Sequence, residues 1–322
     1  KLKLDVSVMD VTSPKTASHF VVGNTQAGIK LIVSKLRDMD IKLSDVLFCC
    51  ENTGIYTCPL SCFLSENKLD YWIVPAIEIK RSKGISRGKS DKADSKDIAY
   101  YSLRNLDKLK LSSMADKEIQ QLKLLFSERE KVMKALHIFR STKENNGFIP
   151  KEVYAAIEAI NTKTIRELNK AKDSVENKIK EIIMSQEELK KQYKLIQSVP
   201  GVGPQTALYL IIATKGFKAF DNWRKLACYS GIAPFEYSSG SSIKGRAKVN
   251  DMADKKMKSL LQMGVISAIQ HDPQMKEYYI KKREQGKPKM LVQNNVRCKI
   301  VSRVFSVINR QSPFINTYKF AG

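Results

Sequence analysis

The sequence predicts a mixed α/β region in residues 1–110, followed by a mainly helical remainder. Apolar residues alternate with polar ones from Leu2 to Val8, which is the side-chain period of a half-buried strand. Further on, from 165 to 196, apolar residues recur at alternating intervals of three and four, with Lys172 and Gln186 filling the two missing places, as in a heptad repeat. Strands that alternate with helices favour a mixed sheet with helices packed on it, and the helical part follows as a second region.

The other elements of the first region follow from the same periodicities. Strands are expected at 19–23, 46–50 and 71–74, and helices at 26–38 and around 60–64. A basic, glycine-containing stretch, residues 79–89, then leads into a helix from about Ser90. It is either a solvated surface loop or a loop that contacts phosphate, and the acidic residues that follow it favour the second interpretation. The cations of this stretch are Lys80, Arg81, Lys83, Arg87 and Lys89.

Residues 115–197 are helical and highly charged. A first helix carries apolar positions between Ile119 and Leu136, and turn-forming residues from Asn145 to Pro150 separate it from the heptad-patterned helix. The pattern predicts an antiparallel helical hairpin or an intermolecular coiled coil. We therefore expect a structural or oligomerising function for this part of the chain.

The last region, residues 198–322, is expected to be mostly helical. Pro200-Gly201-Val202-Gly203 precedes an apolar helix, in the form of a helix–hairpin–helix turn. Gly201 and Gly203 would let backbone N–H groups approach a phosphate, although an ordinary glycine-containing helix entry looks the same. Three further helices are expected, at 223–229, 252–270 and 292–309.

Composition points to a nucleic-acid partner. The 322 residues carry a formal net charge of +23, and each phosphate neutralised by Lys or Arg releases a counterion. A basic protein without such a partner is the alternative, and a membrane surface is disfavoured because the cations are spread through the whole chain. There is no apolar run of membrane-spanning length and no signal-peptide pattern, so we expect a cytoplasmic protein. The 6 cysteines form no CxxC pair, which favours buried free thiols over a zinc site.

Four acidic residues form a candidate metal site. Asp5 lies in the first strand, Glu51 ends the central strand, and Asp91 and Asp94 share one face at the start of a helix that continues to Asp97. Taken singly, each has an ordinary structural interpretation, such as a favourable charge in a first helical turn. Taken together, they resemble the carboxylate sets that hold divalent ions for phosphodiester chemistry.

A serine-rich segment is the candidate nucleophile loop. Ser238, Ser239, Ser241 and Ser242 surround Gly240. Lys244 and Arg246 follow this segment and would stabilise a phosphate. A flexible structural loop is the simpler interpretation from these residues alone. None of the 3 histidines lies near the segment in sequence, so no Ser–His pair is expected.

Four segments in this order resemble a known family. They are Glu51-Asn52-Thr53-Gly54-Ile55-Tyr56, Gly88-Lys89-Ser90-Asp91-Lys92-Ala93-Asp94, Val199-Pro200-Gly201-Val202-Gly203-Pro204, and Gly231-Ile232-Ala233-Pro234 through Ser239-Gly240. With a helical segment between the second and the third, the chain is similar over nearly its whole length to the DEDD transposases of the IS110 group of bacterial insertion sequences. That group is related to the Piv-type DNA invertases.

The resemblance implies an order of domains. It predicts a RuvC-like, ribonuclease H-type metal-binding domain at 1–112, a helical coiled-coil insert at 113–197, and a transposase domain at 198–322. The acidic tetrad of the family maps onto Asp5, Glu51, Asp91 and Asp94, with Mg²⁺ or Mn²⁺ as the cofactor. The family's serine nucleophile maps onto Ser239.

The resemblance also implies partners. These are donor and target DNA, a structured guide RNA encoded by the element, and further copies of the chain in a dimer or tetramer formed through the coiled coil. No membrane partner is expected, and the location would be the bacterial cytoplasm, at the nucleoid.

The sequence departs from the family pattern near both groups of residues. Lys3 stands where the family usually has a glycine two residues before the first aspartate, and Asp10 is a poorer substitute for Asp5. Ser238 and Ser241 flank Ser239, so either could be the nucleophile instead. Two alternative functions stay open: a RuvC-like metal-dependent junction nuclease without a covalent serine step, and a non-catalytic nucleic-acid-binding protein.

Overall fold

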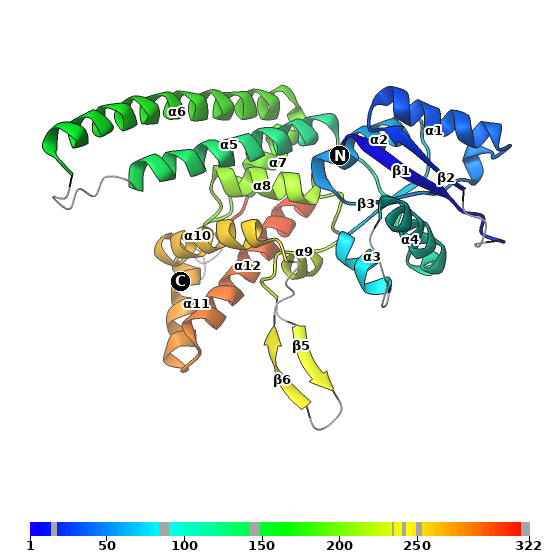
Figure 1. Cartoon of the computed structure of the whole chain (residues 1–322). Helices are drawn as coiled ribbons and strands as arrows, with labels where there is room; N and C mark the ends of the chain where they lie inside the picture. Colours follow the sequence, from blue (N-terminus) through cyan, green and yellow to red (C-terminus); the bar gives the residue numbers. More distant parts are fainter. Residues whose placement is uncertain are drawn as a thin grey trace. The chain divides into compact units, whose positions relative to one another are not determined.

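The computed structural model describes residues 1–13, 18–83, 90–141, 149–233 and 253–316, and only the backbone of two further strands at 235–239 and 243–248. The chain divides into two compact units, Lys1–Met114 and Ala115–Gly322, which we describe separately (Figure 1). None of the helices in the described part of the chain has the length and hydrophobicity needed to span a bilayer.

The first unit combines two strand pairs with four helices. Strands β1 and β2 pair antiparallel, whereas β3 and β4 pair in parallel. The elements are β1 (Lys3–Val8), β2 (Ser18–Gly23), α1 (Gln26–Asp38), β3 (Phe48–Glu51), α2 (Cys58–Glu66), β4 (Tyr71–Val74), α3 (Ala76–Ser82) and α4 (Asp91–Arg104), with short 3₁₀ turns η1 (Leu43–Asp45), η2 (Gly54–Thr57) and η3 (Leu106–Lys108).

The alternation in β1 separates an apolar face from a polar one. Leu4, Val6 and Val8 pack on a core formed by β2 and α1, in which Ile32 and Leu36 are buried. Helix α1 begins where the Thr25 side chain accepts a hydrogen bond from the backbone N–H of Gly28. The polar residues of β1 therefore face the other way, toward α4.

Strand β3 lies between the two cores of this unit. Phe48 packs on the β1–β2 core and Cys49 on a second core around Trp72 and Tyr101, as the strand period requires. Both pairing types of the predicted mixed sheet are present. In the described residues, however, they form two separate strand pairs rather than one continuous sheet.

The second unit is mainly helical and has one large hydrophobic core. Its helices are α5 (Lys117–Ser141), α6 (Lys151–Ser185), α7 (Glu187–Gln197), α8 (Pro204–Thr214), α9 (Trp223–Tyr229), α10 (Lys255–His271), α11 (Pro273–Glu284) and α12 (Lys289–Arg310). Between α9 and α10 lies the antiparallel hairpin of β5 (Phe235–Ser239) and β6 (Ile243–Lys248). Ser238 and Ser239 of the serine-rich segment predicted as a loop thus lie in β5.

Helices α5 and α6 form the predicted antiparallel hairpin (Figure 1). Arg129 Nε donates to Glu176 Oε1 over 2.7 Å, and Arg140 Nη2 donates to Asn169 Oδ1 over 3.3 Å. From the first contact to the second, the residue number rises along α5 and falls along α6, as it does in antiparallel helices. The prediction of one continuous heptad seam was wrong at Gln186, whose extended backbone (φ −119°, ψ 114°) ends α6 and starts α7.

The glycine turn before α8 is a close contact between two backbones. Gly201 has φ +87°, and a Cβ built there would lie 2.4 Å from the carbonyl oxygen of Gly264 in α10. Only a residue without a side chain fits this position. Gly203 differs, because a Cβ built there meets no atom within 4 Å.

Replacing Gly201 with Ala should therefore destabilise the second unit by about 3 kcal/mol, from left-handed backbone strain and the clash with α10. Gly203→Ala is the matched control and should cost less than about 1 kcal/mol. Urea unfolding followed by circular dichroism measures both variants. Equal stabilities would show that α8 and α10 separate without cost.

Candidate functional site

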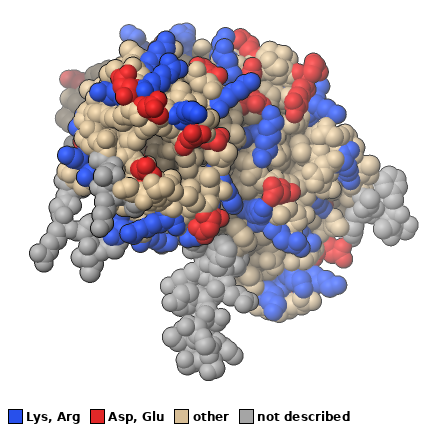
Figure 2. All heavy atoms as spheres, turned by 90° about the vertical axis from the view of Figure 1, so that its right-hand side faces the viewer, with Lys and Arg blue, Asp and Glu red and all other residues tan. Residues whose placement is uncertain are grey.

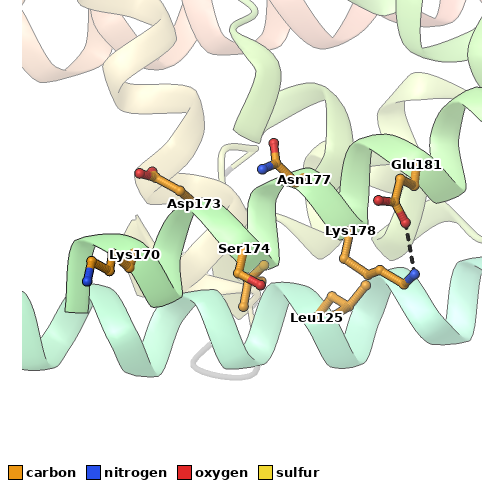
Figure 3. A pocket seen from close by; sticks show the side chains of 8 residues that line it. Leu125, Lys170, Asp173, Ser174, Asn177, Lys178 and Glu181 are labelled. Atoms are coloured by element: carbon orange, nitrogen blue, oxygen red, sulfur yellow. Dashed lines mark hydrogen bonds and ion pairs between the residues drawn. The ribbon is translucent and has the colours of Figure 1, made fainter. Parts of the chain in front are cut away.

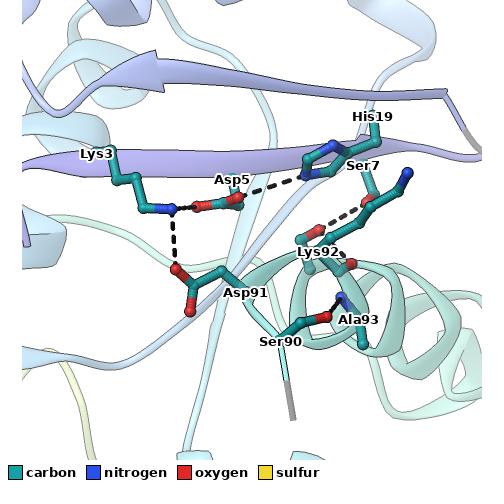
Figure 4. A network of polar contacts seen from close by, with 9 residues as sticks. Lys3, Asp5, Ser7, His19, Ser90, Asp91, Lys92 and Ala93 are labelled. Atoms are coloured by element: carbon teal, nitrogen blue, oxygen red, sulfur yellow. Dashed lines mark hydrogen bonds and ion pairs between the residues drawn. The ribbon is translucent and has the colours of Figure 1, made fainter. Parts of the chain in front are cut away.

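The polar face of β1 packs against the first two turns of α4 (Figure 4). Ser7 Oγ and Ser95 Oγ lie 2.7 Å apart, and Ser95 Oγ also donates to a carbonyl oxygen of its own helix. Helix α4 begins at Ser90, whose side chain accepts from the backbone N–H of Ala93. The serine pair was not among the predicted site residues, although its signal was the two-residue period that places Ser7 on the same face as Asp5.

Lys3 joins the two predicted acids on these elements. Its Nζ lies 3.3 Å from Asp5 Oδ2 and 3.0 Å from Asp91 Oδ2, and Figure 4 shows the ammonium between the two carboxylates. Hydrogen bonding to Asp91, and then to Asp5, raises the pKa of Lys3 above its ordinary value, so the lysine is charged at neutral pH. His19 on β2 also approaches this group, with Nε2 3.5 Å from Asp5 Oδ1.

Asp94 lies on the same helix face and has a different cation. Lys83 Nζ is 2.7 Å from Asp94 Oδ1 and 2.9 Å from Asp97 Oδ2. The hydrogen bond to Asp94 is the largest influence on Lys83 and raises its pKa, in spite of partial burial. Lys83, predicted to contact nucleic acid, is thus paired within the protein.

Glu51 is the last residue of β3 and is half-buried. Since α4 packs on both β1 and β3, all four predicted acids lie on elements that contact one another. Within the described part of the chain, which includes these four residues, no group of three His, Cys, Asp or Glu side chains is assembled to hold a metal ion. The structure therefore brings Asp5 and Asp91 to one cation, while Asp94 and Glu51 remain outside that contact.

Of the predicted phosphate-binding cations, Lys80 and Arg81 are exposed on α3. Arg87 and Lys89 lie outside the described residues, and for Lys244 and Arg246 only the strand backbone is described. Basic side chains occur across the whole face shown in Figure 2, with acidic ones between them.

Ser239 is the last residue of β5 and pairs with Ile243 at the end of the hairpin. Ser238 pairs with Lys244, whereas Ser241 lies outside the described residues. Asp254 joins the two ends of the chain segment that carries the hairpin. Its backbone N–H donates to the carbonyl of Tyr229 over 2.9 Å, and its Oδ2 accepts from Tyr209 over 2.8 Å.

The cysteines do not form a metal site. All 6 are free, and burial raises the pKa of both Cys49 and Cys50 to about 12, which keeps these thiols protonated. Cys58 is exposed, so the expectation of buried thiols was wrong for that residue.

A shallow groove along α5 and α6 is lined mainly by polar side chains (Figure 3). Lys178 pairs with Glu181 over 2.8 Å at one end, and Leu125 supplies an apolar contact. This groove belongs to the helical hairpin of the second unit and contains none of the predicted site residues.

Two family models and several known proteins match this chain. A DEDD transposase model of the IS110 type matches residues 1–141, and the model for the transposase IS116/IS110/IS902 family matches residues 193–280. The chain is 25% identical to the pilin gene-inverting protein of Moraxella bovis over 295 residues, which cover 90% of this chain and 88% of that protein. It is 26% identical over 235 residues to the pilin gene-inverting protein of Moraxella lacunata, which cover 73% of this chain and 70% of that protein.

A shorter match extends to an insertion-element protein. The chain is 31% identical over 93 residues to an IS110 protein of Streptomyces coelicolor, covering 29% of this chain and 23% of that one. These matches define an enzyme of the DEDD transposase and recombinase class. The chain belongs to the IS110 family of transposases and is related to the pilin gene-inverting proteins. Membership implies a ribonuclease H-like first domain, binding to DNA and use of a divalent metal.

The serine pair gives a test of how α4 is held on β1. Ser95→Ala removes a nearly buried hydroxyl that bonds across 88 residues of sequence, and should lower the stability of the first unit by about 1 kcal/mol. Ser44→Ala, which removes only an exposed bond to its neighbour, is the control and should have little effect. Thermal unfolding measures both, and equal melting temperatures would contradict the assigned contact.

Proposed function

We propose that the chain cuts and rejoins DNA strands with a serine nucleophile and a divalent metal, Mg²⁺ or Mn²⁺. Asp5, Glu51, Asp91 and Asp94 would hold the metal, and Ser239 would attack the phosphodiester. The observation that carries this proposal is the approach of Asp5 and Asp91, 86 positions apart in sequence, to a single cation within 3.3 Å. Carboxylate oxygens are the ligands that such ions prefer.

The proposed attack by Ser239 needs no reactant other than the DNA. The Ser239 oxygen bonds to phosphorus, the bond from phosphorus to one sugar oxygen breaks, and the serine proton ends on the released hydroxyl. Attack by a hydroxyl of another strand reverses these steps and rejoins the DNA. A metal bound by the acids would stabilise negative charge on the phosphoryl oxygens.

The positive charge of the chain supports a nucleic-acid assembly. A net charge of +23 suits a protein that neutralises several phosphates, and exposed Lys80 and Arg81 precede the acidic helix. We propose donor and target DNA as partners, and a structured guide RNA encoded by the element. Such an assembly would be located at the nucleoid, with residues 1–112, 113–197 and 198–322 acting as separate functional parts.

An exposed apolar stripe on α6 supports assembly with a second copy. Val153, Ile157 and Ile160 follow helical spacing on one face, and each is at least 40% exposed. An exposed apolar stripe of this kind is commonly covered in an assembly, and a coiled-coil contact between two hairpins would cover it.

The first rival function is a junction nuclease without a covalent serine step, and the second is a nucleic-acid binder without catalysis. Asp91→Asn should reduce DNA cleavage roughly a hundredfold or more, because it weakens the hold on the metal that would stabilise the transition state. Ser239→Ala should abolish the covalent protein–DNA adduct and all recombinant product.

A gel assay with labelled donor and target DNA, in Mg²⁺ or Mn²⁺ and with the RNA transcribed from beside the gene, measures cleavage and adduct together. Asp107→Asn, an exposed acid of the same unit, is the control and should keep full activity. Cleavage that survives Ser239→Ala without an adduct would favour the nuclease. No cleavage by the unaltered chain in any divalent metal would favour the non-catalytic binder.

The stripe has its own test by sedimentation. Ile157→Glu should weaken self-association on the order of tenfold or more, since it places a charge in the apolar contact. Ala155→Glu adds the same charge on the opposite face of α6 and should leave the oligomeric state unchanged. Equal sedimentation of the two variants would exclude the stripe as the interface.

A further inference from the structure

We propose that Lys3 is an internal counterion that holds Asp5 and Asp91 together in the metal-free protein and must leave before a divalent ion can bind them. The inference rests on the proposed metal site and goes beyond it, because it makes one residue the competitor of the ion. On this proposal, Lys3 sets the concentration of divalent metal at which the site is filled.

The geometry places the ammonium where a shared ion would have to lie. Lys3 Nζ contacts one oxygen of each carboxylate, at 3.3 Å and 3.0 Å. A divalent ion bridging the same two oxygens needs shorter bonds, of about 2.0–2.1 Å for Mg²⁺. Both cations cannot occupy the space between one pair of carboxylates, so binding of one excludes the other.

The surroundings allow the lysine to leave. The Lys3 side chain is 55% exposed and the Asp91 side chain 67% exposed, whereas Asp5 is 13% exposed. A lysine on the edge of the contact can move its flexible stem into solvent, while Asp5 stays fixed on β1. Asp5 is therefore the anchored member of the group, whereas Lys3 and Asp91 are open to solvent.

Electrostatics gives the direction of the effect. Without a cation between them, two carboxylates this close repel one another, and Lys3 offsets that repulsion. When a divalent ion arrives, the same ammonium becomes a repelling neighbour. Removing the lysine should therefore weaken the metal-free arrangement and strengthen metal binding.

The test uses the full chain with Mn²⁺ alone as the probe. Lys3→Gln should bind Mn²⁺ roughly tenfold more tightly than the unaltered chain in calorimetric titration, as expected for one charge removed at a surface site. Lys3→Arg keeps the charge and should bind like the unaltered chain. Lys30→Gln removes an exposed lysine of α1 and controls for net charge.

Thermal unfolding supplies a second readout that does not depend on activity. In EDTA, Lys3→Gln should melt below the unaltered chain, and saturating Mn²⁺ should raise its melting temperature by the larger amount. The larger rise with Mn²⁺ is not expected if Lys3 merely supports the strand. In that case the substitution would lower the melting temperature equally in EDTA and in Mn²⁺.

The outcomes separate this inference from the proposed function. Equal Mn²⁺ affinities of the unaltered chain and Lys3→Gln, with Asp5→Asn failing to bind, would keep the metal site and overturn the role of Lys3. Weaker binding by Lys3→Gln would also overturn it. If neither the unaltered chain nor Lys3→Gln binds Mn²⁺, the metal site itself is wrong and the inference falls with it.

Discussion

The packing of α4 on the polar face of β1 is the contact on which the acidic site depends. A strand advances about 13 Å between Lys3 and Ser7, whereas a helix advances about 6 Å between Asp91 and Ser95. Because these lengths differ, the strand residues and the helix residues can be in direct contact at one end only. The short serines meet there, and at the other end the long side chain of Lys3 spans the remaining gap to Asp91. The lysine is therefore part of how the acids are positioned, as well as of their charge balance.

Acids that are to meet a phosphate need cations around them. A group of carboxylates repels the DNA backbone, and in this chain three of the four predicted acids lie beside lysines that offset this repulsion: Lys3 for Asp5 and Asp91, and Lys83 for Asp94. A strongly basic chain thus preserves an acidic site by local pairing rather than by overall composition.

Local patterns predicted much of this architecture, and contacts distant in sequence account for what they missed. The alternation in β1, the start of α4 and the helical spacing of α5 and α6 all follow from patterns within one element. The break at Gln186 does not, because a polar residue fits a heptad equally well and the direction of α7 depends on its packing against α8 and α12. Likewise, Gly201 resembles a phosphate-binding turn in sequence, and only the approach of Gly264 shows its structural role. The Lys3–Asp91 contact joins residues 3 and 91, so no local pattern contains it.

The acids and Ser239 belong to different compact units, each packed on its own core. The contacts within the first unit bring Asp5 and Asp91 to Lys3 without any contribution from the unit that carries Ser239. The proposed restraint of Lys3 on metal binding therefore acts within the first unit by itself.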